Sequence, residues 1–269
     1  MIVEHLTSRL LAALGCEAGE LQFRPAPGEN RNLVVETATP IHLFAKVPDA
    51  CALHVAREKE LYKLISGRHL SPVLWNEGNH REDLLISKPI DGRSFEVALI
   101  ESQVNVFAAV LQETWQHLQA IQADADLAAW LRAELVNWVG PYASDFSPRT
   151  ELVATDPAWH EILPQESGAR VVVHGSLSPN NMIVRDRNQA GQDNLVGILD
   201  WEGCRVAPVG FDEASLLHAL MNEAPRCAGV WIDLMARRSG RKADCAIHMA
   251  WIWSTLTHQP HAGGQACSV

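Results

Sequence analysis

The sequence predicts an α+β protein with two lobes, a small antiparallel sheet with one helix followed by a mainly helical part. Its 269 residues exceed the usual size of a single domain and allow a sizeable hydrophobic core. Runs typical of strands lie before residue 90, whereas helical periodicity dominates from residue 102 onward. We therefore expect an N-terminal lobe of residues 1–89 and a C-terminal lobe of residues 90–269.

The elements of the first lobe follow from local patterns. Apolar residues recur at helical spacing over residues 3–14, and Gly15 suits the end of that helix. Asp49 can cap a second helix that runs to about Ile65 and ends at Gly67. Short apolar runs predict five strands, at residues 21–24, 32–36, 41–47, 72–75 and 83–87.

The second lobe is predicted to be mainly helical. A short strand at 170–173 leads into a loop at 174–181. The apolar runs 182–184 and 195–199 flank a polar segment and predict a hairpin. Helical spacing predicts helices at residues 106–121, 127–139, 212–222, 226–237 and 243–257.

Composition excludes several classes of protein. The formal net charge of −10 argues against a nucleic-acid partner, since phosphate binding needs clustered Lys and Arg. No apolar run is long enough to span a bilayer, and charged residues interrupt the N-terminus where a signal peptide would be apolar. The six cysteines are scattered without a Cys-x-x-Cys pair, which favours free thiols in a reducing compartment. We expect a cytoplasmic protein without a membrane partner.

Two oxygen-bearing side chains stand at the ends of the predicted hairpin. Asn181 precedes its first strand and Asp200 follows its second, so the turn brings the two residues side by side. An amide oxygen and a carboxylate are the hard ligands that Mg²⁺ prefers, and Mg²⁺ needs only one or two protein groups. The spacing predicts a magnesium site formed by Asn181 and Asp200.

Lys46 ends an apolar strand, where a buried ammonium group is costly without a partner. Glu58, on the following helix, is a plausible partner. A Lys–Glu pair of this kind holds the lysine toward the α- and β-phosphates in kinases.

These residues resemble a known family. The stretches Val-His-Gly-Ser-Leu-Ser-Pro-Asn-Asn at 173–181 and Ile-Leu-Asp-Trp-Glu at 198–202 resemble the aminoglycoside phosphotransferase and choline kinase-like family. That family has a bilobal protein-kinase-like fold. The resemblance covers most of the chain, roughly from Gly28 to the helix after Asp212.

The resemblance implies roles for individual residues. Lys46 in Phe-Ala-Lys-Val matches the nucleotide-binding lysine, and Glu58 matches its helix glutamate, with Glu60 as an alternative. Residues 86–89, Ile-Ser-Lys-Pro, stand where an interlobe hinge would offer backbone groups to adenine, and Gly28 lies in the turn that covers the phosphates. Further matches are the structural His174, the metal ligands Asn181 and Asp200, the hinge residue Ser87, and Asp212, which braces the catalytic loop.

The chain departs from the family pattern at its catalytic position. Ser176 stands where the family has the Asp that accepts the proton of the substrate hydroxyl, and Ser178 and Asn180 replace a His and a Gly. A serine hydroxyl is not a base near neutral pH, and general-base catalysis typically contributes about 10²- to 10⁴-fold. Positioning and charge stabilisation carry most of the acceleration in phosphoryl transfer, so nucleotide binding is expected to survive.

We expect an ATP- and Mg²⁺-dependent phosphotransferase that acts on a hydroxyl of an aminoglycoside-, choline- or sugar-like small molecule. Its catalytic residues are expected to be Ser176, Asn181 and Asp200. A carboxylate such as Glu202, or one on the substrate, could stand in for the missing base, or Ser176 could be a substitution in an otherwise working enzyme. The alternatives are a nucleotide-binding pseudokinase with a regulatory or scaffolding role, a peptide kinase, and an adenylyl transferase. The sequence does not indicate an oligomeric state.

Overall fold

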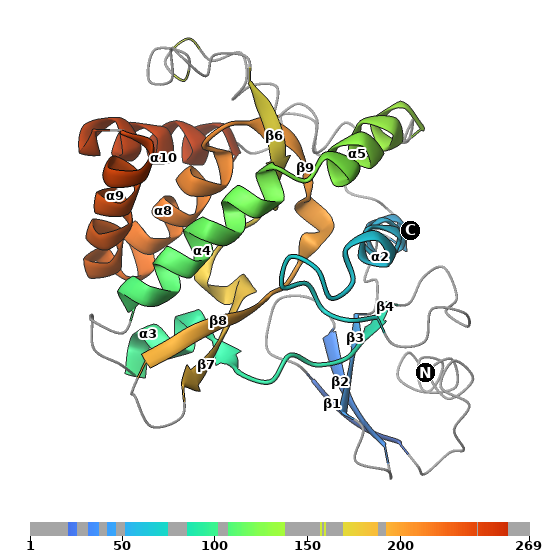
Figure 1. The fold of residues 1–269 in the computed structure, drawn as a ribbon. Coiled ribbons are helices and arrows are strands. Elements are labelled where there is room, and N and C mark those ends of the chain that lie inside the picture. Colours follow the sequence, from blue (N-terminus) through green and yellow to red (C-terminus); the bar gives the residue numbers. More distant parts are fainter. Residues whose placement is uncertain are drawn as a thin grey trace.

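The computed structural model describes residues 21–25, 32–37, 42–46, 52–74, 85–101, 107–137, 157, 159, 169–187, 192–240 and 242–257. Up to residue 57 it describes the backbone alone. The helix expected at 3–14 and the turn that contains Gly28 lie outside the described residues. The fold class is confirmed, since small antiparallel sheets and a mainly helical second part form the molecule (Figure 1).

A four-stranded antiparallel sheet forms the first part, in the order β1-β2-β3-β4. Its strands are β1 (Leu21–Pro25), β2 (Asn32–Thr37), β3 (His42–Lys46) and β4 (Leu85–Ser87). The strand expected at 72–75 is wrong within the described residues, where Leu74 forms only an isolated bridge with Ser87. Pro72 has no N–H to donate, and the N–H of Leu74 donates to the hydroxyl of Ser66 at 3.0 Å instead of to a strand.

Helix α2 (Ala52–Ile65) follows β3 and packs with one face in the core. Leu61, Tyr62 and Ile65 are buried, at spacings of one, three and four residues along the helix. The helix gives way to a turn at Gly67, whose φ of 69° lies in the left-handed region that glycine adopts readily. This ending agrees with the prediction from the sequence.

Six further helices are described in the second part of the chain. They are α3 (Phe95–Glu101), α4 (Phe107–Gln122), α5 (Ala125–Asn137), α8 (Phe211–Glu223), α9 (Pro225–Ser239) and α10 (Ala243–Thr257). All but α3 were expected. Helix α4 crosses the middle of the lobe, with α8, α9 and α10 packed on one side of it (Figure 1). The rings of Trp115 and Trp231 meet edge to face at 5.7 Å where α4 contacts α9.

Two small sheets carry the catalytic-loop region. The predicted hairpin is confirmed as β7 (Met182–Arg187) and β8 (Gln192–Ile198), flanked by the short β5 (Arg93–Ser94). Its strands extend further into the polar segment than expected, because polar residues at the exposed end of a hairpin pair through their backbones. The structure also adds a second sheet in which β6 (Arg170–Val173) pairs with the unexpected β9 (Arg205–Pro208).

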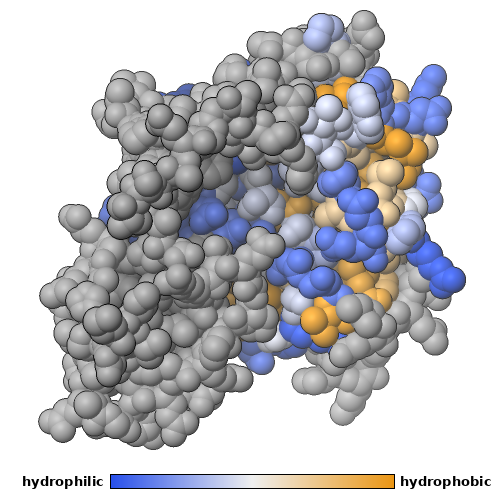
Figure 2. All heavy atoms as spheres, turned by 180° about the vertical axis from the view of Figure 1, so that it is seen from behind, coloured by the Kyte–Doolittle hydropathy of each residue, from blue (hydrophilic) through white to orange (hydrophobic). Residues whose placement is uncertain are grey.

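Hydrophobic and hydrophilic side chains alternate over the part of the surface coloured in Figure 2. Trp251 and Trp253 lie two residues apart on α10, and Trp251 is 64% exposed whereas Trp253 packs against the core. One of the two thus faces away from the core, as expected. Among the described residues, no disulfide involves Cys204, Cys227 or Cys245. No helix in the described ranges has the length and apolar character needed to cross a bilayer.

Candidate active site

The loop at 174–181 begins at the buried end of β6 and is held there by a carboxylate from α8. Asp212 is fully buried in the first turn of α8. Its two oxygens accept hydrogen bonds from the backbone N–H groups of His174 at 2.7 Å and Gly175 at 2.9 Å. The loop is thus fixed through its backbone, whichever side chains it carries.

The environment of Asp212 combines burial with two donors. Burial raises the pKa of its carboxyl group from 3.8 to about 7, and the N–H groups of Gly175 and His174 oppose this rise by binding the ionised form. The negative charge of Glu213 raises the pKa further, while the positive charge of Arg205 lowers it. The brace inferred for Asp212 from the family resemblance matches these contacts.

His174 joins the loop to the strand that precedes Asp200. Its side chain is fully buried, and burial lowers the pKa of the imidazole to about 4, against the charge of Asp200. The ring is therefore neutral near pH 7, and Nε2–H donates to the carbonyl of Leu199 at 2.9 Å. This tautomer leaves Nδ1 to accept the N–H of Ser176 at 3.4 Å.

Asn181 and Asp200 are brought together by the hairpin and by Ser176. The N–H of Leu199 donates to the carbonyl of Asn181 at 2.7 Å, which joins the two ends of the hairpin. The Nδ2 of Asn181 donates to the carbonyl of Ser176 at 2.9 Å, and the Oγ of Ser176 donates to the carbonyl of Asp200 at 3.1 Å. Because a carbonyl can only accept, these bonds assign the amide nitrogen of Asn181 and leave its Oδ1 as a ligand atom.

Asp200 lies in an unusual backbone conformation. Its φ of 64° and ψ of 57° are left-handed, which is uncommon for a residue other than glycine. The short helix η3 (Trp201–Gly203) follows directly. Such strain persists only where the surroundings hold it, and it concentrates at functional sites.

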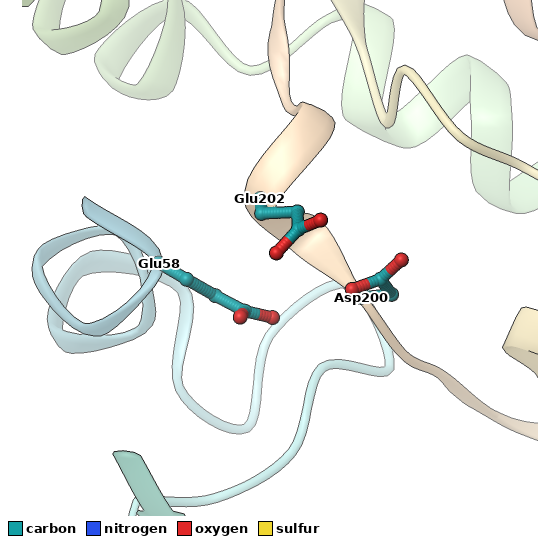
Figure 3. Close-up of side chains that lie close together, drawn as sticks. All are labelled: Glu58, Asp200 and Glu202. Carbon is teal, nitrogen blue, oxygen red and sulfur yellow. The ribbon is translucent and has the colours of Figure 1, made fainter. Parts of the chain in front are cut away.

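Three carboxylates converge beside this strained residue. Glu58 from α2, Asp200 and Glu202 from η3 each offer an oxygen, and these oxygens all lie within 4.8 Å of one another (Figure 3). Like charges this close disfavour one another, so a cation is the natural complement. Carboxylate oxygens are the hard ligands that Mg²⁺ prefers, and these three residues fit that ion.

The structure separates the two candidate helix glutamates. Glu58 is 1% exposed, and its Oε1 accepts the N–H of Trp201 at 3.1 Å. Glu60 points to solvent and pairs with Lys63 on the same helix at 2.5 Å. Glu58 is thus the one that faces the site.

The structure describes the remaining candidates from the sequence in different detail. Ser87 is buried at the end of β4. Lys46 ends β3 directly opposite Leu85, and its side chain is not among those described. In the proposed hinge, the N–H of Lys88 already donates to the carbonyl of Val73 at 2.8 Å, so it is not available to a base.

Tyr62 belongs to the site and was missed from the sequence. Burial raises the pKa of its phenol well above 10.0, with the charge of Glu58 and a hydrogen bond to that carboxylate as further causes. Tyr62 stands four residues after Glu58, so the two share one face of α2. This four-residue spacing is the sequence signal that could have placed Tyr62 beside Glu58.

Several solved structures have a similar fold. The structure is similar to aminoglycoside phosphotransferase APH(3'')-Id from Streptomyces rimosus, with a TM-score of 0.59 and 17% identity over 95% of this chain and 98% of that one. It is similar to an ethanolamine kinase from Plasmodium vivax, with a TM-score of 0.62 and 13% identity over 90% of this chain and 74% of the other. A thermostable mutant of APH(4)-Ia, in a ternary complex with ADP and hygromycin B, gives a TM-score of 0.56 and 15% identity over 92% and 87% of the two chains.

Such low identities show a shared fold and nothing finer. No curated protein sequence matches this chain. The family profile described as "Phosphotransferase enzyme family" (APH), however, matches residues 20–238. That match covers well over half of the 269 residues, and the chain therefore belongs to the phosphotransferase enzyme family.

Proposed function

We propose that the protein is an ATP- and Mg²⁺-dependent phosphotransferase whose acceptor is a hydroxyl group of a small molecule. The observation that carries this proposal is the hydrogen-bonded arrangement in which Ser176 contacts both Asn181 and Asp200 while Glu58 faces Asp200. We take residues 1–89 as the nucleotide-binding lobe and residues 90–269 as the lobe that carries the catalytic loop and the acceptor site.

Each polar residue has a role in this proposal. The Oδ1 of Asn181 and the carboxylate of Asp200 would hold Mg²⁺, which supplies charge neutralisation on the phosphates. Lys46, at the end of β3, would contact the phosphates with Glu58 as its orienting partner. Ser87 and Gly28 would contribute to the nucleotide pocket from β4 and from the turn that covers the phosphates.

The acceptor is proposed to be aminoglycoside-, choline- or sugar-like. The titles of similar structures name hygromycin B and streptomycin as bound molecules, and one similar protein is an ethanolamine kinase. Each of these molecules combines hydroxyl groups with amino or guanidino groups. The net charge of −10 is compatible with a cationic acceptor of this kind.

Ser176 would orient the acceptor without taking its proton. The hydroxyl hydrogen of Ser176 points to the carbonyl of Asp200, so its oxygen can accept a hydrogen bond from an acceptor hydroxyl. Phosphoryl transfer proceeds through a loose transition state, in which positioning and charge stabilisation carry most of the acceleration. We expect slow turnover with normal nucleotide binding.

Nucleotide binding tests the first half of the proposal. Calorimetry should show that wild-type protein binds the ATP analogue AMP-PNP more tightly with Mg²⁺ than with EDTA. Asp200→Asn should remove most of that difference, since it replaces a metal-binding carboxylate by an amide. Glu60→Gln is the matched control, because Glu60 is exposed and bonded to Lys63, and it should bind as wild type does. Absence of binding by wild type would contradict the proposal.

Restoring the carboxylate tests the second half. Ser176→Asp should raise phosphoryl transfer to a panel of hydroxylated amines by about 10²-fold or more, the usual contribution of a general base. Turnover is measured as ADP formation that depends on the acceptor. Mass spectrometry of the product distinguishes a transferred phosphoryl group from a nucleotidyl group, and a peptide panel tests the peptide-kinase alternative.

Ser176 itself favours one second candidate, a nucleotide-binding pseudokinase with a regulatory or scaffolding role. This candidate predicts that both wild type and Ser176→Asp bind nucleotide and that neither transfers phosphate to any acceptor. In either case we propose a reducing, cytoplasmic setting, in keeping with six cysteines that are scattered without a Cys-x-x-Cys pair.

A further inference from the structure

The turn that follows α2 holds two non-glycine residues in the left-handed region. His69 has a φ of 49° and Leu70 a φ of 56°, next to Gly67 with a φ of 69°. Bonds within the turn close it, from Arg68 N–H to Ile65 O at 2.7 Å and from Ser71 Oγ to the same carbonyl at 2.6 Å. Two adjacent strained residues persist only where contacts outside the turn hold them.

One outside contact is made by the side chain of His69. Its Nε2 lies 2.6 Å from Oδ2 of Asp124, in the link between α4 and α5, and the two side chains are only 11% and 5% exposed. Burial raises the pKa of Asp124, but hydrogen bonds from Leu127 N–H and His69, with the charges of Arg68 and His69, outweigh this effect and lower it. The carboxylate is thus ionised, so His69 donates through Nε2–H.

A second contact holds the backbone of the same residue. The Nε2 of His117, on α4, lies 2.6 Å from the carbonyl oxygen of His69. Burial lowers the pKa of His117 to about 4, so its ring is neutral near pH 7, and Nε2–H donates because a carbonyl only accepts. Both the side chain and the backbone of His69 are therefore tied to the α4–α5 region.

The turn also contacts the segment that carries the proposed metal ligand. The carbonyl of Leu70 accepts the N–H of Ile198 at 2.9 Å, two residues before Asp200. The ring of His69 lies 6.4 Å from the ring of Trp201, and the backbone N–H of Trp201 donates to Glu58. Figure 3 shows the pale blue loop after α2 beside the ribbon that carries Asp200 and Glu202.

We propose that His69 is a positioning residue, which acts through its contact with Asp124 to fix Glu58 and Asp200 at the spacing that binds the metal–nucleotide complex. This inference rests on the proposed function and adds to it a residue outside the family motifs. The turn is the connection between α2, which carries Glu58, and the α4–α5 junction of the helical lobe. If the turn shifts, the spacing between Glu58 and Asp200 is no longer fixed.

The test measures how strongly Mg²⁺ enhances nucleotide binding. Calorimetry gives the affinity for AMP-PNP with Mg²⁺ and with EDTA, and the ratio of the two is the metal enhancement. His69→Asn should reduce this ratio about tenfold, the usual effect of losing an outer partner of a metal ligand, while the affinity in EDTA stays unchanged. Asparagine adopts the left-handed conformation readily, so this variant removes the contact with Asp124 without adding backbone strain.

Two further variants separate positioning from general stability. His69→Gln places an amide N–H near the position of Nε2 and should recover most of the enhancement. Asp124→Ser keeps an N-cap for α5, but its side chain is too short to reach His69, so it should reduce the metal enhancement as His69→Asn does. The double variant should reduce the enhancement no further than either single variant does. Arg68→Gln is the matched control, because it removes the other, half-exposed partner of the same Asp124 oxygen, and it should leave the enhancement unchanged.

The outcomes distinguish this inference from the function on which it rests. Wild-type protein that binds no nucleotide would overturn the proposed function and this inference with it. Wild-type binding with an unchanged enhancement in both His69→Asn and Asp124→Ser would overturn this inference alone. Thermal unfolding without ligand verifies that each variant is folded, and an equal loss of affinity with and without Mg²⁺ would also overturn the inference.

Discussion

Two turns meet at the candidate site, and each is held by an aspartate in a different way. Asp212 holds the start of the catalytic loop through the backbone N–H groups of residues 174 and 175. Asp124 holds the turn after α2 through the side chains of Arg68 and His69. The pKa of Asp212 is raised to about 7, chiefly by burial. For Asp124 the effect of burial is outweighed by hydrogen bonds and nearby positive charges, and the pKa is lowered.

The difference explains which positions tolerate change. A loop fixed by its own N–H groups keeps its shape when its side chains are replaced, and Ser176 stands in such a loop with Asn181 and Asp200 still in place. The turn after α2 is held through side chains, and His69 is the less exposed of the two partners of Asp124. We therefore expect the proposed metal site to persist with Ser176 in place of the family's carboxylate, and a change at His69 to disturb it.

The largest expected effect compares a glycine in each turn. Gly175→Ala should cost about 3 kcal/mol or more, because the new Cβ would lie 2.0 Å from the carbonyl oxygen of Gly203 and φ is 90°. Gly67→Ala should cost only about 1–2 kcal/mol, since φ is 69° but the nearest atom, on Val73, is 3.6 Å away. Urea unfolding of both variants measures the free energy of unfolding.

Gly229 on α9 is the control for this pair, because a Cβ there meets nothing within 4 Å. Gly229→Ala should stabilise the protein by about 0.5–1 kcal/mol through helix propensity. Equal losses for Gly175→Ala and Gly67→Ala would mean that the contact with Gly203 does not constrain the catalytic loop.

A smaller effect is expected from Asp212→Asn. The amide keeps one acceptor oxygen, so one of the two buried N–H groups of His174 and Gly175 loses its partner, at a cost of about 1–3 kcal/mol. Asp244→Asn, at the exposed start of α10, is the matched control and should cost less than about 1 kcal/mol. A change in Asp212→Asn no larger than in the control would show that the brace adds nothing to stability.

A further prediction compares the same variant with wild type across pH. The pKa of Asp212 is raised in the folded protein, so its contribution to stability is complete below 3.8 and is lost as the pH rises toward about 7. The difference in unfolding free energy between wild type and Asp212→Asn should therefore shrink from acidic to neutral pH. Unfolding curves over this range measure it, and a difference that grows with pH would contradict the shift.

Local patterns were sufficient for most elements and for the residues that are close in sequence. Two apolar runs around a polar middle predict the β7–β8 hairpin, and the hairpin alone places Asn181 beside the segment of Asp200. The predicted strands of this hairpin are too short, because the polar residues at its exposed end pair through backbone groups, and backbone groups carry no sequence signal. Strand β9 is only four residues long, and its pairing with β6 depends on long-range contacts.

Long-range contacts also decide between candidate residues that the sequence could not separate. Glu58 and Glu60 are equally placed for a helix glutamate in the sequence, and only the contact of Glu58 with Trp201, 143 residues away, separates them. The pairing of His69 with Asp124 spans 55 residues and lies outside any recognised motif. Such contacts become visible only when the two lobes are placed together.

The close approach of Gly175 to Gly203 has a consequence for how the sequence can vary in evolution. A Cβ at position 203 would meet backbone atoms of His174 and Gly175 at 3.2 Å, so that backbone would have to move by a few tenths of an ångström, whereas a Cβ at 175 would collide with the carbonyl oxygen of Gly203 at 2.0 Å. We therefore expect relatives with this loop geometry to be confined to glycine more strictly at 175 than at 203. An alignment of natural variants would record that asymmetry directly.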